Sequence, residues 1–349
     1  MVLSCKPDRL IDNHCVHEVV RMRKKCWVIS VGCGPNQAPL IMAAKNYGYS
    51  VIGIDRSPVA DLADISIPIS TYSKEDVVAM LREAGKYLKF EGVLCRSSGP
   101  ALDTAFAIAK TYSLLSAGRA VVECSVSKWH LYGWAKSNAI PTIPTLRCKE
   151  LIAAPEGWDA VVVKPAAPVY GKKNVFLVKE ADQMGPAIDK ACNESLDGHS
   201  IVQPFVPGED VGLVTLSREG EILWNAFYQE STTFKNGTLL GVEVTSLPNN
   251  FDAQVKKRVL DYAKVMLRKS HSSGFVFFTF RCTSLRNPLL YEVNPGLCGD
   301  YLAEKLLPAM WPGTDFFMMD VAVMTGRSFE LPAGSPLAAK VVHGKVSDE

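Results

Sequence analysis

The sequence contains no long run of apolar residues. A helix that crosses a membrane needs about 20 consecutive apolar residues. No stretch of the 349 residues approaches that length, although 48% of them are hydrophobic. Residues 1–25 also lack the apolar centre of a secretory signal. We therefore expect a flexible N-terminal extension at 1–25, no membrane partner and a cytoplasmic location.

Net charge is nearly absent as well. The 38 Lys and Arg residues and the 36 Asp and Glu residues leave a formal net charge of +2. So small a charge creates no strong field for a polyanion, and we expect no nucleic-acid partner. The composition is that of an ordinary globular protein, and the length suits two or three domains with cores of their own.

The ten cysteines show neither a CxxC pair nor a regular spacing. Without an export signal, free thiols in a reducing compartment are the expected state. Cys5, His14, Cys15 and His17 lie close together in the N-terminal extension, but their spacing fits no standard zinc site. We therefore expect no structural zinc in this part of the chain.

Short apolar strands and helices alternate in residues 26–123. The expected elements are strands at 26–31, 51–54 and 92–95, and helices that end at Tyr47, begin at Lys74 and span 101–110. A strand followed by a helix and a second strand is the unit from which parallel sheets are built. The pattern predicts a doubly wound α/β domain of the Rossmann-like type.

The glycine turn after the first strand leaves an alternative open. GCGPNQ at 32–37, with Asp55 after the second strand, also occurs in folds that bind nicotinamide dinucleotides. The third glycine of that fingerprint is missing, and Pro35 stands where the pyrophosphate-binding helix would begin. A nicotinamide-dependent oxidoreductase is therefore an alternative interpretation, which leaves the charged residues further along the chain unexplained.

The remaining chain predicts a mixed set of elements. The expected helices are 125–139, 180–192, 251–270, 301–307 and 316–324, and the expected strands are 161–165, 175–178, 200–206, 211–216 and 222–227. Two further strands within 275–299, joined by a polar turn at 284–288, predict a hairpin. A polar tail is expected at 332–349.

Two lysines and a hairpin carry groups that suit a bound polyphosphate. Lys128 falls in the first turn of an expected helix, and Lys164 ends the strand VVVKP. Glu292 and Asn294 are two residues apart on a strand, so their side chains leave the same face. A carboxylate and an amide are oxygen ligands that suit Mg²⁺, which completes its shell with water and phosphate. A triphosphate requires such cations and a metal ion together.

These residues belong to segments that resemble a known superfamily. The segments SKWHLYGWAKSNAIPTIPT, VVVKP, YGKKNVFLV, IVQPFVPGED and YEVNPG are similar, in order and spacing, to motifs of the ATP-grasp superfamily in its carboxylate–amine/thiol ligase branch. The resemblance runs from about Cys26 to Arg327. It implies an α/β fold, α+β in the ATP-grasp part. A Rossmann-like pre-ATP-grasp domain at 26–123 would precede ATP-grasp subdomains at 124–203 and 204–331.

The resemblance also implies roles for individual residues. The cofactors would be ATP and Mg²⁺, with Mn²⁺ as an alternative cation. Two lysines would bind phosphates, a loop would cover them, and the strand at 200–206 would hold the adenine and the ribose. The cofactor-binding residues would be Lys128, Lys164, Gly171, Lys173, Gln203, Phe205, Val206 and Glu209, the catalytic residues Arg281 and Lys172, and the metal ligands Glu292 and Asn294.

Three positions depart from the family's pattern. Ser127 stands where an Asp is usual, and Gly296 stands where many members have an arginine. Thr279 stands where an acid or Gln commonly provides the other metal ligand. Arg281 would face the same side of its strand as Thr279, and we hypothesise that it replaces the missing arginine. The carboxylates that could substitute as metal ligands are Glu230, Glu243 and Asp300.

The resemblance implies an activity and its partners. ATP would phosphorylate a small-molecule carboxylate, and an amine would then displace phosphate from the acyl phosphate to form an amide. A homodimer is one option, because many relatives pair through the N-terminal domain. The departures at Thr279 and Gly296 leave a second interpretation open, in which the protein is ATP-grasp-like and binds nucleotide but is catalytically impaired.

Overall fold

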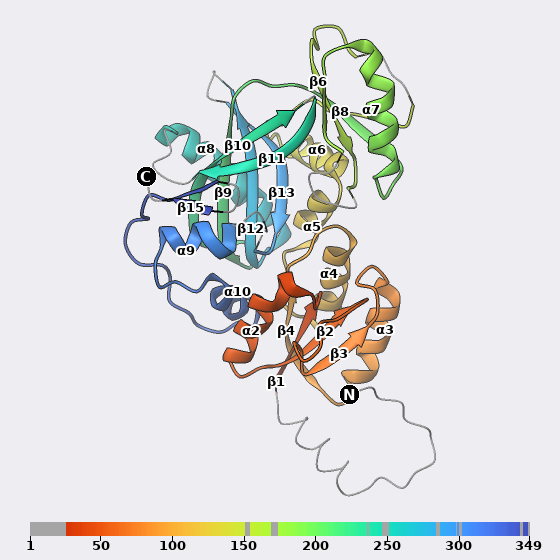
Figure 1. The fold of residues 1–349 in the computed structure, drawn as a ribbon. Coiled ribbons are helices and arrows are strands. Elements are labelled where there is room, and N and C mark those ends of the chain that lie inside the picture. Colours follow the sequence, from red (N-terminus) through yellow and green to blue (C-terminus); the bar gives the residue numbers. More distant parts are fainter. Residues whose placement is uncertain are drawn as a thin grey trace, which may run out of the picture. The chain divides into compact units, whose positions relative to one another are not determined.

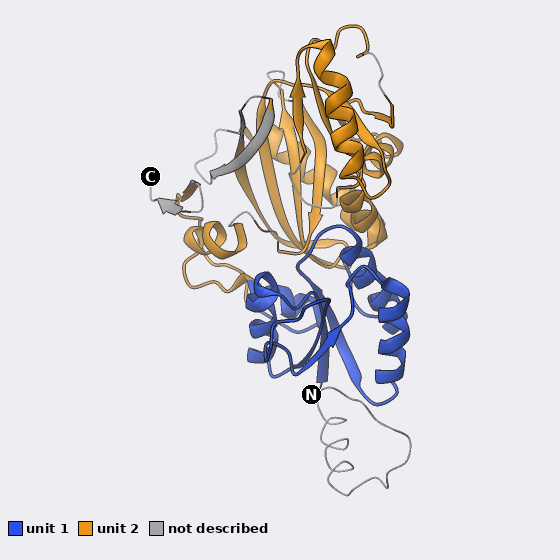
Figure 2. Cartoon of the chain, turned by 45° about the vertical axis from the view of Figure 1, so that its right-hand side comes forward, with its two compact units in different colours: residues 1–116, 317–329 blue, residues 117–316, 330–349 orange. Residues whose placement is uncertain are grey.

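The computed structural model describes residues 26–150, 154–168, 174–235, 237–245, 251–283, 287–297, 299, 302–342 and 345–347. Within 232–235, 238–245, 342 and 345–347 it describes the backbone alone. The expected extension at 1–25 lies outside these residues. The chain forms two compact units, Met1–Ser116 with Phe317–Phe329 and Ala117–Phe316 with Glu330–Glu349 (Figure 2).

A parallel sheet forms the centre of the first unit, with its strands in the order β3-β2-β1-β4 (Figure 1). The unit contains β1 (Cys26–Val31), a 3₁₀ turn (Pro35–Gln37), α2 (Ala38–Asn46), β2 (Ser50–Asp55), β3 (Ile65–Pro68), α3 (Lys74–Ala84), β4 (Lys89–Cys95), α4 (Pro100–Tyr112) and α10 (Phe316–Met324). Its strands β1 and β2 are buried on both faces, as in parallel sheets covered by helices.

Helices cover each face of this sheet. Helices α3 and α4 pack on the face that includes Ile29 and Ile52, and α2 and α10 pack on the face that includes Val28 and Val51. Helix α10 therefore completes the core of a unit that begins almost 300 residues earlier in the chain. Residues 317–329 belong to this first unit, whereas the expected ATP-grasp subdomain runs over 204–331.

An antiparallel sheet of 11 strands forms the second unit, in the order β13-β12-β9-β10-β11-β7-β6-β8-β5, with β14 on β11 and β15 on β14. Its first elements are α5 (Arg119–Val126), α6 (Lys128–Ser137), β5 (Leu146–Cys148), β6 (Val161–Pro165), β7 (Phe176–Val178), α7 (Ala181–Asn193), β8 (Ser200–Pro204) and β9 (Glu209–Arg218). The others are β10 (Glu221–Lys235), β11 (Thr238–Thr245), α8 (Ala253–Ser270), β12 (Gly274–Cys282), β13 (Pro288–Pro295), a π-helical turn (Leu302–Leu306), α9 (Leu307–Met310), β14 (Lys340–Val342) and β15 (Lys345–Ser347).

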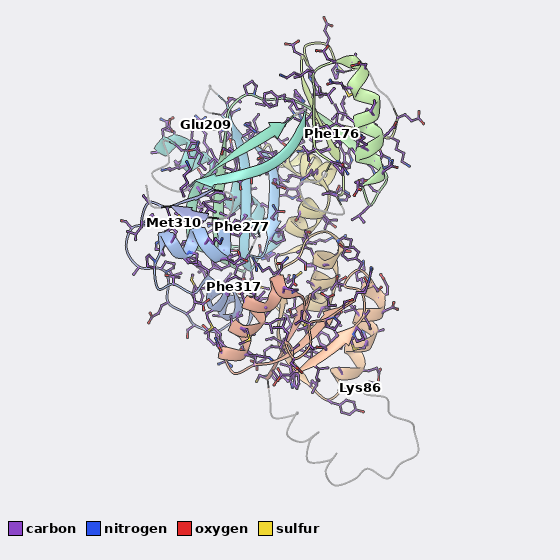
Figure 3. All side chains as sticks on the ribbon, in the orientation of Figure 1. Lys86, Phe176, Glu209, Phe277, Met310 and Phe317 are labelled. Carbon is purple, nitrogen blue, oxygen red and sulfur yellow. The ribbon has the colours of Figure 1, made fainter. Side chains whose placement is uncertain are left out.

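The helices of the second unit that precede residue 271 cover two separate cores. Helix α7 packs on β6 and β8, and helices α5, α6 and α8 pack on β9, β12 and β13. Since successive residues of a strand point to opposite faces, each strand presents its alternate residues to the side away from these helices. Those alternate residues include Lys164 in β6, Asp210 in β9 and Arg281 in β12. The side chains that cover the strands are drawn in Figure 3, where Phe277 of β12 is labelled.

The predicted fold class, α/β with an α+β second part, is confirmed, and the strands Cys26–Val31 and Val161–Pro165 and the helix Phe316–Met324 have the predicted bounds. The single helix expected at 125–139 is wrong. The chain forms α5 and α6 instead, because Ser127 between them is extended, with φ −130° and ψ 117°.

Helix α5 spans residues 123 and 124, where a domain boundary is expected, and the first unit ends at Ser116. The tail expected at 332–349 contains β14, which pairs with β11, and β15, which pairs with β14. In the described part of the chain, no helix combines the length and the apolar character needed to cross a membrane.

Candidate functional site

Lys164 lies at the end of β6, on the face of the strand that points away from α7. Val163 packs against α7, so its neighbour Lys164 points the other way. Lys164 is 8% exposed, and its Nζ lies 5.4 Å from the centre of the Tyr291 ring. Burial and the nearby ammonium of Lys128 lower the pKa of Lys164 to about 7, against the attraction of Glu292. Lys164 is therefore a desolvated cation that a bound anion would stabilise.

Helix α6 brings Lys128 to the same place. Ser127 is the N-cap of the helix, and its hydroxyl accepts a hydrogen bond of 3.3 Å from the N–H of His130. The N–H of Lys128 donates to the carbonyl of Ala166, 2.8 Å away, which ties the first turn of α6 to the segment after β6. The ammonium of Lys128 forms an ion pair with Glu292, with 3.4 Å between Nζ and Oε1. Helix α6, β6 and β13 thus bring three charged groups together.

A β-bulge in β13 sets the direction of Glu292. Thr279 of β12 pairs with Glu292, and the register then shifts to Leu290, which skips Tyr291. Leu290 and Val293 both belong to the core beneath α5 and α8. Two residues three positions apart can face the same side of a strand only because the bulge adds one residue between them. Tyr291 and Glu292 therefore both lie on the opposite face, beside the two lysines.

The oxygen ligands around Glu292 fit one divalent cation. Asn294 follows two residues later on the same strand, and its Oδ1 lies 3.5 Å from Oγ of Ser125 in α5. Thr279, directly across from Glu292, is 4% exposed and provides a neutral hydroxyl. One carboxylate and one amide match the few protein ligands that Mg²⁺ takes when water and phosphate complete its shell. The side chains that the structure describes form no cluster of three or more His, Cys, Asp and Glu that could hold a metal ion.

A buried acid next to this site was missed by the sequence analysis. Asp210 of β9 lies across from Arg281 of β12 and is 1% exposed. The distance between Oδ1 of Asp210 and Nε of Arg281 is 3.0 Å. Burial raises the pKa of Asp210 to about 6, although Arg281 and a hydrogen bond from Tyr291 act in the opposite direction. The only signal in the sequence is the pair of acids after Gly208, and Glu209 was chosen as the functional one.

Gly208 explains how the chain closes around Arg281. Its carbonyl accepts a hydrogen bond of 2.7 Å from Nη1 of Arg281. A Cβ at this position would lie 2.2 Å from the carbonyl oxygen of Cys282, and the φ of 153° is one that residues with side chains rarely adopt. Glycine therefore allows the turn before β9 to approach β12 closely enough for this contact.

The residues expected to hold adenine and ribose lie on β8 and just after it. Gln203 is buried, and its Nε2 donates to Oγ1 of Thr145 at 2.8 Å. Gln203 pairs with Val162 of β6, and Val162 is two residues from Lys164 and points to the same face. Gln203 therefore lies on the same face of the sheet as Lys164. Phe205 is exposed, Val206 is half-buried, and Glu209 is exposed at the start of β9 (Figure 3). Nothing in the structure tests the roles expected for these residues.

The other expected residues can be placed only in part. Gly171, Lys172, Lys173 and Asp300 lie outside the described residues, as does the side chain of Glu243. Glu230 pairs with Asp210 in the register of β9 and β10, so it lies on the same face as the Asp210–Arg281 pair.

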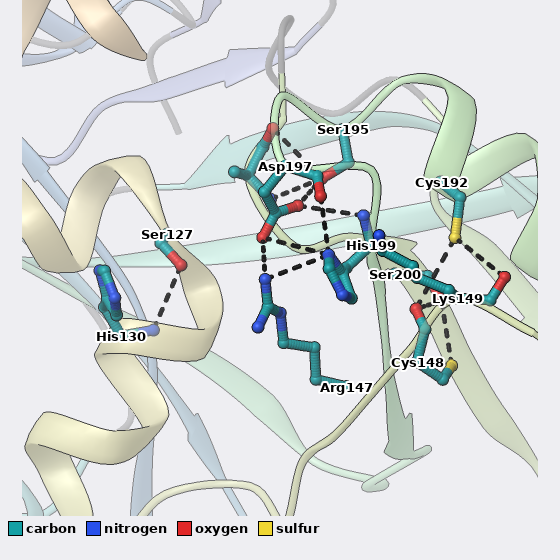
Figure 4. Close-up of polar contacts among 11 residues, drawn as sticks. Ser127, His130, Arg147, Cys148, Lys149, Cys192, Ser195, Asp197, His199 and Ser200 are labelled. Atoms are coloured by element: carbon teal, nitrogen blue, oxygen red, sulfur yellow. Dashed lines mark hydrogen bonds and ion pairs between the residues drawn. The ribbon is translucent and has the colours of Figure 1, made fainter.

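A second polar cluster, shown in Figure 4, supports the site without joining it. The carboxylate of Asp197 accepts hydrogen bonds from the hydroxyl of Ser195 (2.7 Å), from Nη2 of Arg147 (2.8 Å) and from the N–H of His199 (3.1 Å). Burial opposes these bonds, but together they hold the pKa of Asp197 below its usual range. The hydroxyl of Ser195 also accepts a hydrogen bond of 2.9 Å from the N–H of Ala167. The cluster thus closes the turn between α7 and β8 and holds the segment after β6 in place.

A cavity of about 680 Å³ lies along α7, away from the charged residues of the site. Its lining comes from β7, from α7 and its N-cap region, and from Gly237. It includes Val178 and Ala187, which belong to the core beneath α7. The cavity therefore opens on the helix-covered side of the strands, whereas Lys164 points to the other side.

Comparisons with known proteins address the fold. The sequence matches no protein-family model and no curated protein. Three similar solved structures are an L-amino acid ligase from Bacillus licheniformis (16% identity, TM-score 0.68, 86% of this chain and 74% of that one), an ADP complex of N5-carboxyaminoimidazole ribonucleotide synthetase (15%, 0.69, 91% and 81%) and the biotin carboxylase domain of 2-oxoglutarate carboxylase from Hydrogenobacter thermophilus (14%, 0.64, 87% and 70%).

All three are ATP-grasp carboxylate–amine ligases, and the likeness extends over most of this chain. Their identity to it is low, so what they share with it is the arrangement of the elements. That arrangement includes the Rossmann-like first unit, the antiparallel sheet of the second unit and the two helix-covered cores described above. The protein therefore has the ATP-grasp fold.

Proposed function

We propose that the protein is an ATP-dependent ligase that joins a small-molecule carboxylate to an amine. The observation that carries the proposal is the convergence of Lys128, Lys164 and Glu292 on one face of a sheet with the ATP-grasp fold. Among the similar structures, one is an ADP complex and one holds MgADP and bicarbonate. They support a nucleotide as the ligand of these lysines.

Different residues would bind different parts of ATP. Lys128 and Lys164 would neutralise the phosphates, and Glu292 and Asn294 would hold one Mg²⁺. Gln203, with the backbone of Phe205 and Val206, would bind the adenine, and Glu209 the ribose. Lys172 and Lys173 lie in the loop expected to cover the phosphates and exclude water from them. Bound Mg²⁺ would offset charge that develops on the phosphate oxygens.

The reaction would proceed in two steps. An oxygen of the substrate carboxylate attacks the γ-phosphorus of ATP, and the bond to the β-phosphate oxygen breaks to release ADP. The amine nitrogen then attacks the acyl carbon, phosphate leaves, and the nitrogen loses a proton. The described residues form no covalent bond in this scheme. Lys128 and Lys164 position the phosphoryl group and stabilise its charge.

Arg281 is the expected catalytic residue whose position is informative. Its Nε faces Asp210 and its Nη1 donates to Gly208, so these contacts already direct the guanidinium toward β9. Replacement of the family's missing arginine by Arg281 is still our hypothesis. An Arg281→Ala variant with unchanged turnover would contradict it.

The organisation of the chain would follow the fold. The two cores of the second unit support a division into two subdomains near residues 203 and 204, with the nucleotide between them. A homodimer is the proposed assembly, and one similar structure is a domain dimer. The seven described cysteines are free, which supports the expected reducing, cytoplasmic location.

A catalytically impaired nucleotide-binding protein is the second candidate. Two observations favour it. Thr279, and not an acid, lies across from Glu292, and Asp210 is committed to an ion pair with Arg281. Such a protein would bind ATP and release no ADP with any acceptor.

The deciding experiment measures ADP release from MgATP in the presence of pooled carboxylic acids and pooled amines, with mass spectrometry of each pool that responds. A product whose mass equals one acid plus one amine minus water supports the ligase and identifies both substrates. No ADP from any pool, with a rise in melting temperature on addition of ATP, would favour the impaired protein. If no pool releases ADP and ATP does not raise the melting temperature, both candidates are contradicted.

A further inference from the structure

The ion pair between Lys128 and Glu292 joins two groups that have different tasks in the proposed function. Lys128 is expected to bind phosphate, and Glu292 is the carboxylate expected to bind a divalent cation. Their side chains are 16% and 28% exposed, so the pair is largely shielded from water. In the structure the ammonium of Lys128 thus contacts the carboxylate that a metal ion would bind.

The backbone on both sides of this pair is fixed. The N–H of Lys128 donates to the carbonyl of Ala166, and Ser127 caps the helix at that point. Glu292 is held in the β12–β13 hairpin, across from Thr279. Any separation of the two charges must therefore come from the two side chains, of which that of Lys128 is the longer and the more flexible.

A metal ion on Glu292 and the ammonium 3.4 Å from its Oε1 would repel each other, because both are cations held close to one carboxylate. The neutral hydroxyl of Thr279 adds no further negative charge beside Glu292, so one lysine is enough to neutralise that carboxylate. Lys164 is less suited to the same task, because it is buried at the end of β6 against the ring of Tyr291. Lys128 is the more accessible of the two lysines and the one in contact with Glu292.

We propose that Lys128 is a latch on Glu292, which it occupies in the nucleotide-free protein and releases when its ammonium binds a nucleotide phosphate. The proposal rests on the proposed function for the identity of the anion. It couples the two ligands: a divalent cation binds Glu292 more tightly once the nucleotide has drawn Lys128 away. The coupling is reciprocal, because any group that binds Glu292 also releases Lys128 for phosphate.

The first test measures Mn²⁺ binding to the nucleotide-free protein by electron paramagnetic resonance. Replacement of the ammonium in Lys128→Met should strengthen Mn²⁺ binding by about three- to tenfold, the range expected for one partly shielded ion pair. Lys136→Met is the matched control, because Lys136 is an exposed lysine in the last turn of the same helix. The gain should disappear in Lys128→Met combined with Glu292→Gln. Equal Mn²⁺ affinity in Lys128→Met and the wild type, or a gain that survives Glu292→Gln, would overturn the proposal.

The second test measures ADP binding by calorimetry in excess chelator, so that no metal ion contributes. Glu292→Gln frees Lys128 and should strengthen metal-free ADP binding by about three- to tenfold. If Glu292 simply repels the phosphates, Glu292→Gln should strengthen ADP binding in the Lys128→Met background as well. If Glu292→Gln acts by releasing Lys128, it should not strengthen ADP binding in that background. A gain of the same size in both backgrounds therefore contradicts the latch.

These measurements separate the latch from the proposed function. If the wild type binds no ADP, the proposed function fails, while the Mn²⁺ comparison still decides whether Lys128 occupies Glu292. Melting temperatures of all variants show whether they are folded. If Lys128→Met does not fold, Lys128→Gln takes its place with the same expected result.

Discussion

The two faces of strand β12 differ in what they bury. One face carries Val276, Phe278 and Phe280, which pack with α5 and α8 in the larger core of the second unit. The other face carries Phe275 and Phe277 toward the start of the strand and Thr279 and Arg281 toward its end, and the last two pair with Glu292 on β13 and Asp210 on β9. Both faces are well buried, since Thr279, Asp210 and Phe278 are all less than a tenth exposed.

Within one strand, the apolar residues and the charged residues therefore have different effects on stability and on ligand binding. Burial of apolar surface contributes stability in proportion to the area removed from water. Burial of a charge has a cost that ion pairs and hydrogen bonds offset only in part. We therefore expect substitutions on the apolar face to destabilise the protein. Substitutions of the charged residues, together with Lys164 and Glu292, should change ligand binding more than stability, and some should stabilise the protein.

The largest effect is expected on the apolar face. Phe278→Ala leaves a cavity in a fully buried position and should lower the free energy of unfolding by about 3–5 kcal/mol. Denaturant unfolding followed by fluorescence measures the change. Leu223→Ala, at an exposed position on β10, is the control and should cost well under about 1 kcal/mol. Similar losses for the two variants would contradict the assignment of Phe278 to the main core.

A large effect on binding is expected at Lys164. Lys164→Met removes the desolvated ammonium, keeps a side chain of similar length, and should weaken ADP binding by about a hundredfold. The same change should raise the free energy of unfolding by about 1 kcal/mol, because an apolar group no longer resists burial. Calorimetry with ADP and denaturant unfolding provide the two measurements. Lys179→Met, at an exposed position after β7, should change neither. Weaker binding together with lower stability would indicate that Lys164 has a structural role.

Local pattern was enough to predict most of the longer strands and to single out three charged residues and one amide, whereas the strands at 65–68, 146–148 and 238–245 were not predicted. Lys128, Lys164, Glu292 and Asn294 each depend on a helix start or on strand alternation, which neighbours in the sequence determine. The pair of Asp210 with Arg281 depends instead on the contact between β9 and β12, which β10, β11 and α8 separate in the chain. No local signal could find it.

The same limit explains why Glu209 was preferred to Asp210. Both acids follow Gly208, and their alternation places them on opposite faces of β9. The register pairs Arg281 with Asp210 and Cys282 with Glu209, so only the long-range pairing reveals which acid faces Lys164. The bulge at Tyr291 was hidden for a related reason. It appears only when Leu290 and Val293 are seen to share one core.

A pH-dependent effect is expected at Asp210. Its pKa is raised from 3.8 to about 6 in the folded protein, so the folded state holds this proton more tightly than the unfolded state does. The stability linked to this proton is present below about pH 4 and is lost as the pH rises through about 6. Asp210→Asn cannot ionise. Its stability relative to the wild type should therefore rise by about 2 kcal/mol between pH 4 and pH 7.

Paired unfolding curves at several pH values test this expectation, since contributions from all other groups cancel in the difference. Asp261→Asn is the control, because Asp261 is a half-exposed acid on α8, in ion pairs with Lys257 and Lys264. Its difference from the wild type should stay within about 0.5 kcal/mol across the range. A difference for Asp210→Asn that is constant with pH, or that falls as the pH rises, would show that Arg281 outweighs burial.

The smallest effect on binding is expected at Thr279, a buried residue with a neutral polar side chain. Thr279→Glu adds a carboxylate directly across from Glu292, and the single ammonium of Lys128 can then neutralise only one of the two. Nucleotide-free protein should bind Mn²⁺ about tenfold more tightly as a result. Thr279→Gln adds an amide of the same length without charge and should strengthen Mn²⁺ binding by less than Thr279→Glu does.

The stability of the two Thr279 variants makes this test stricter. Both place a longer polar side chain at a buried position and should lose about 1–3 kcal/mol without metal. Thr279→Glu should recover more stability than Thr279→Gln when Mn²⁺ is added, because ligands that bind the folded state alone stabilise it in proportion to their affinity. Equal recovery by the two variants would mean that the added charge does not reach the cation. Recovery by neither would mean that Lys128 still neutralises Glu292 and that the added carboxylate does not reach the cation.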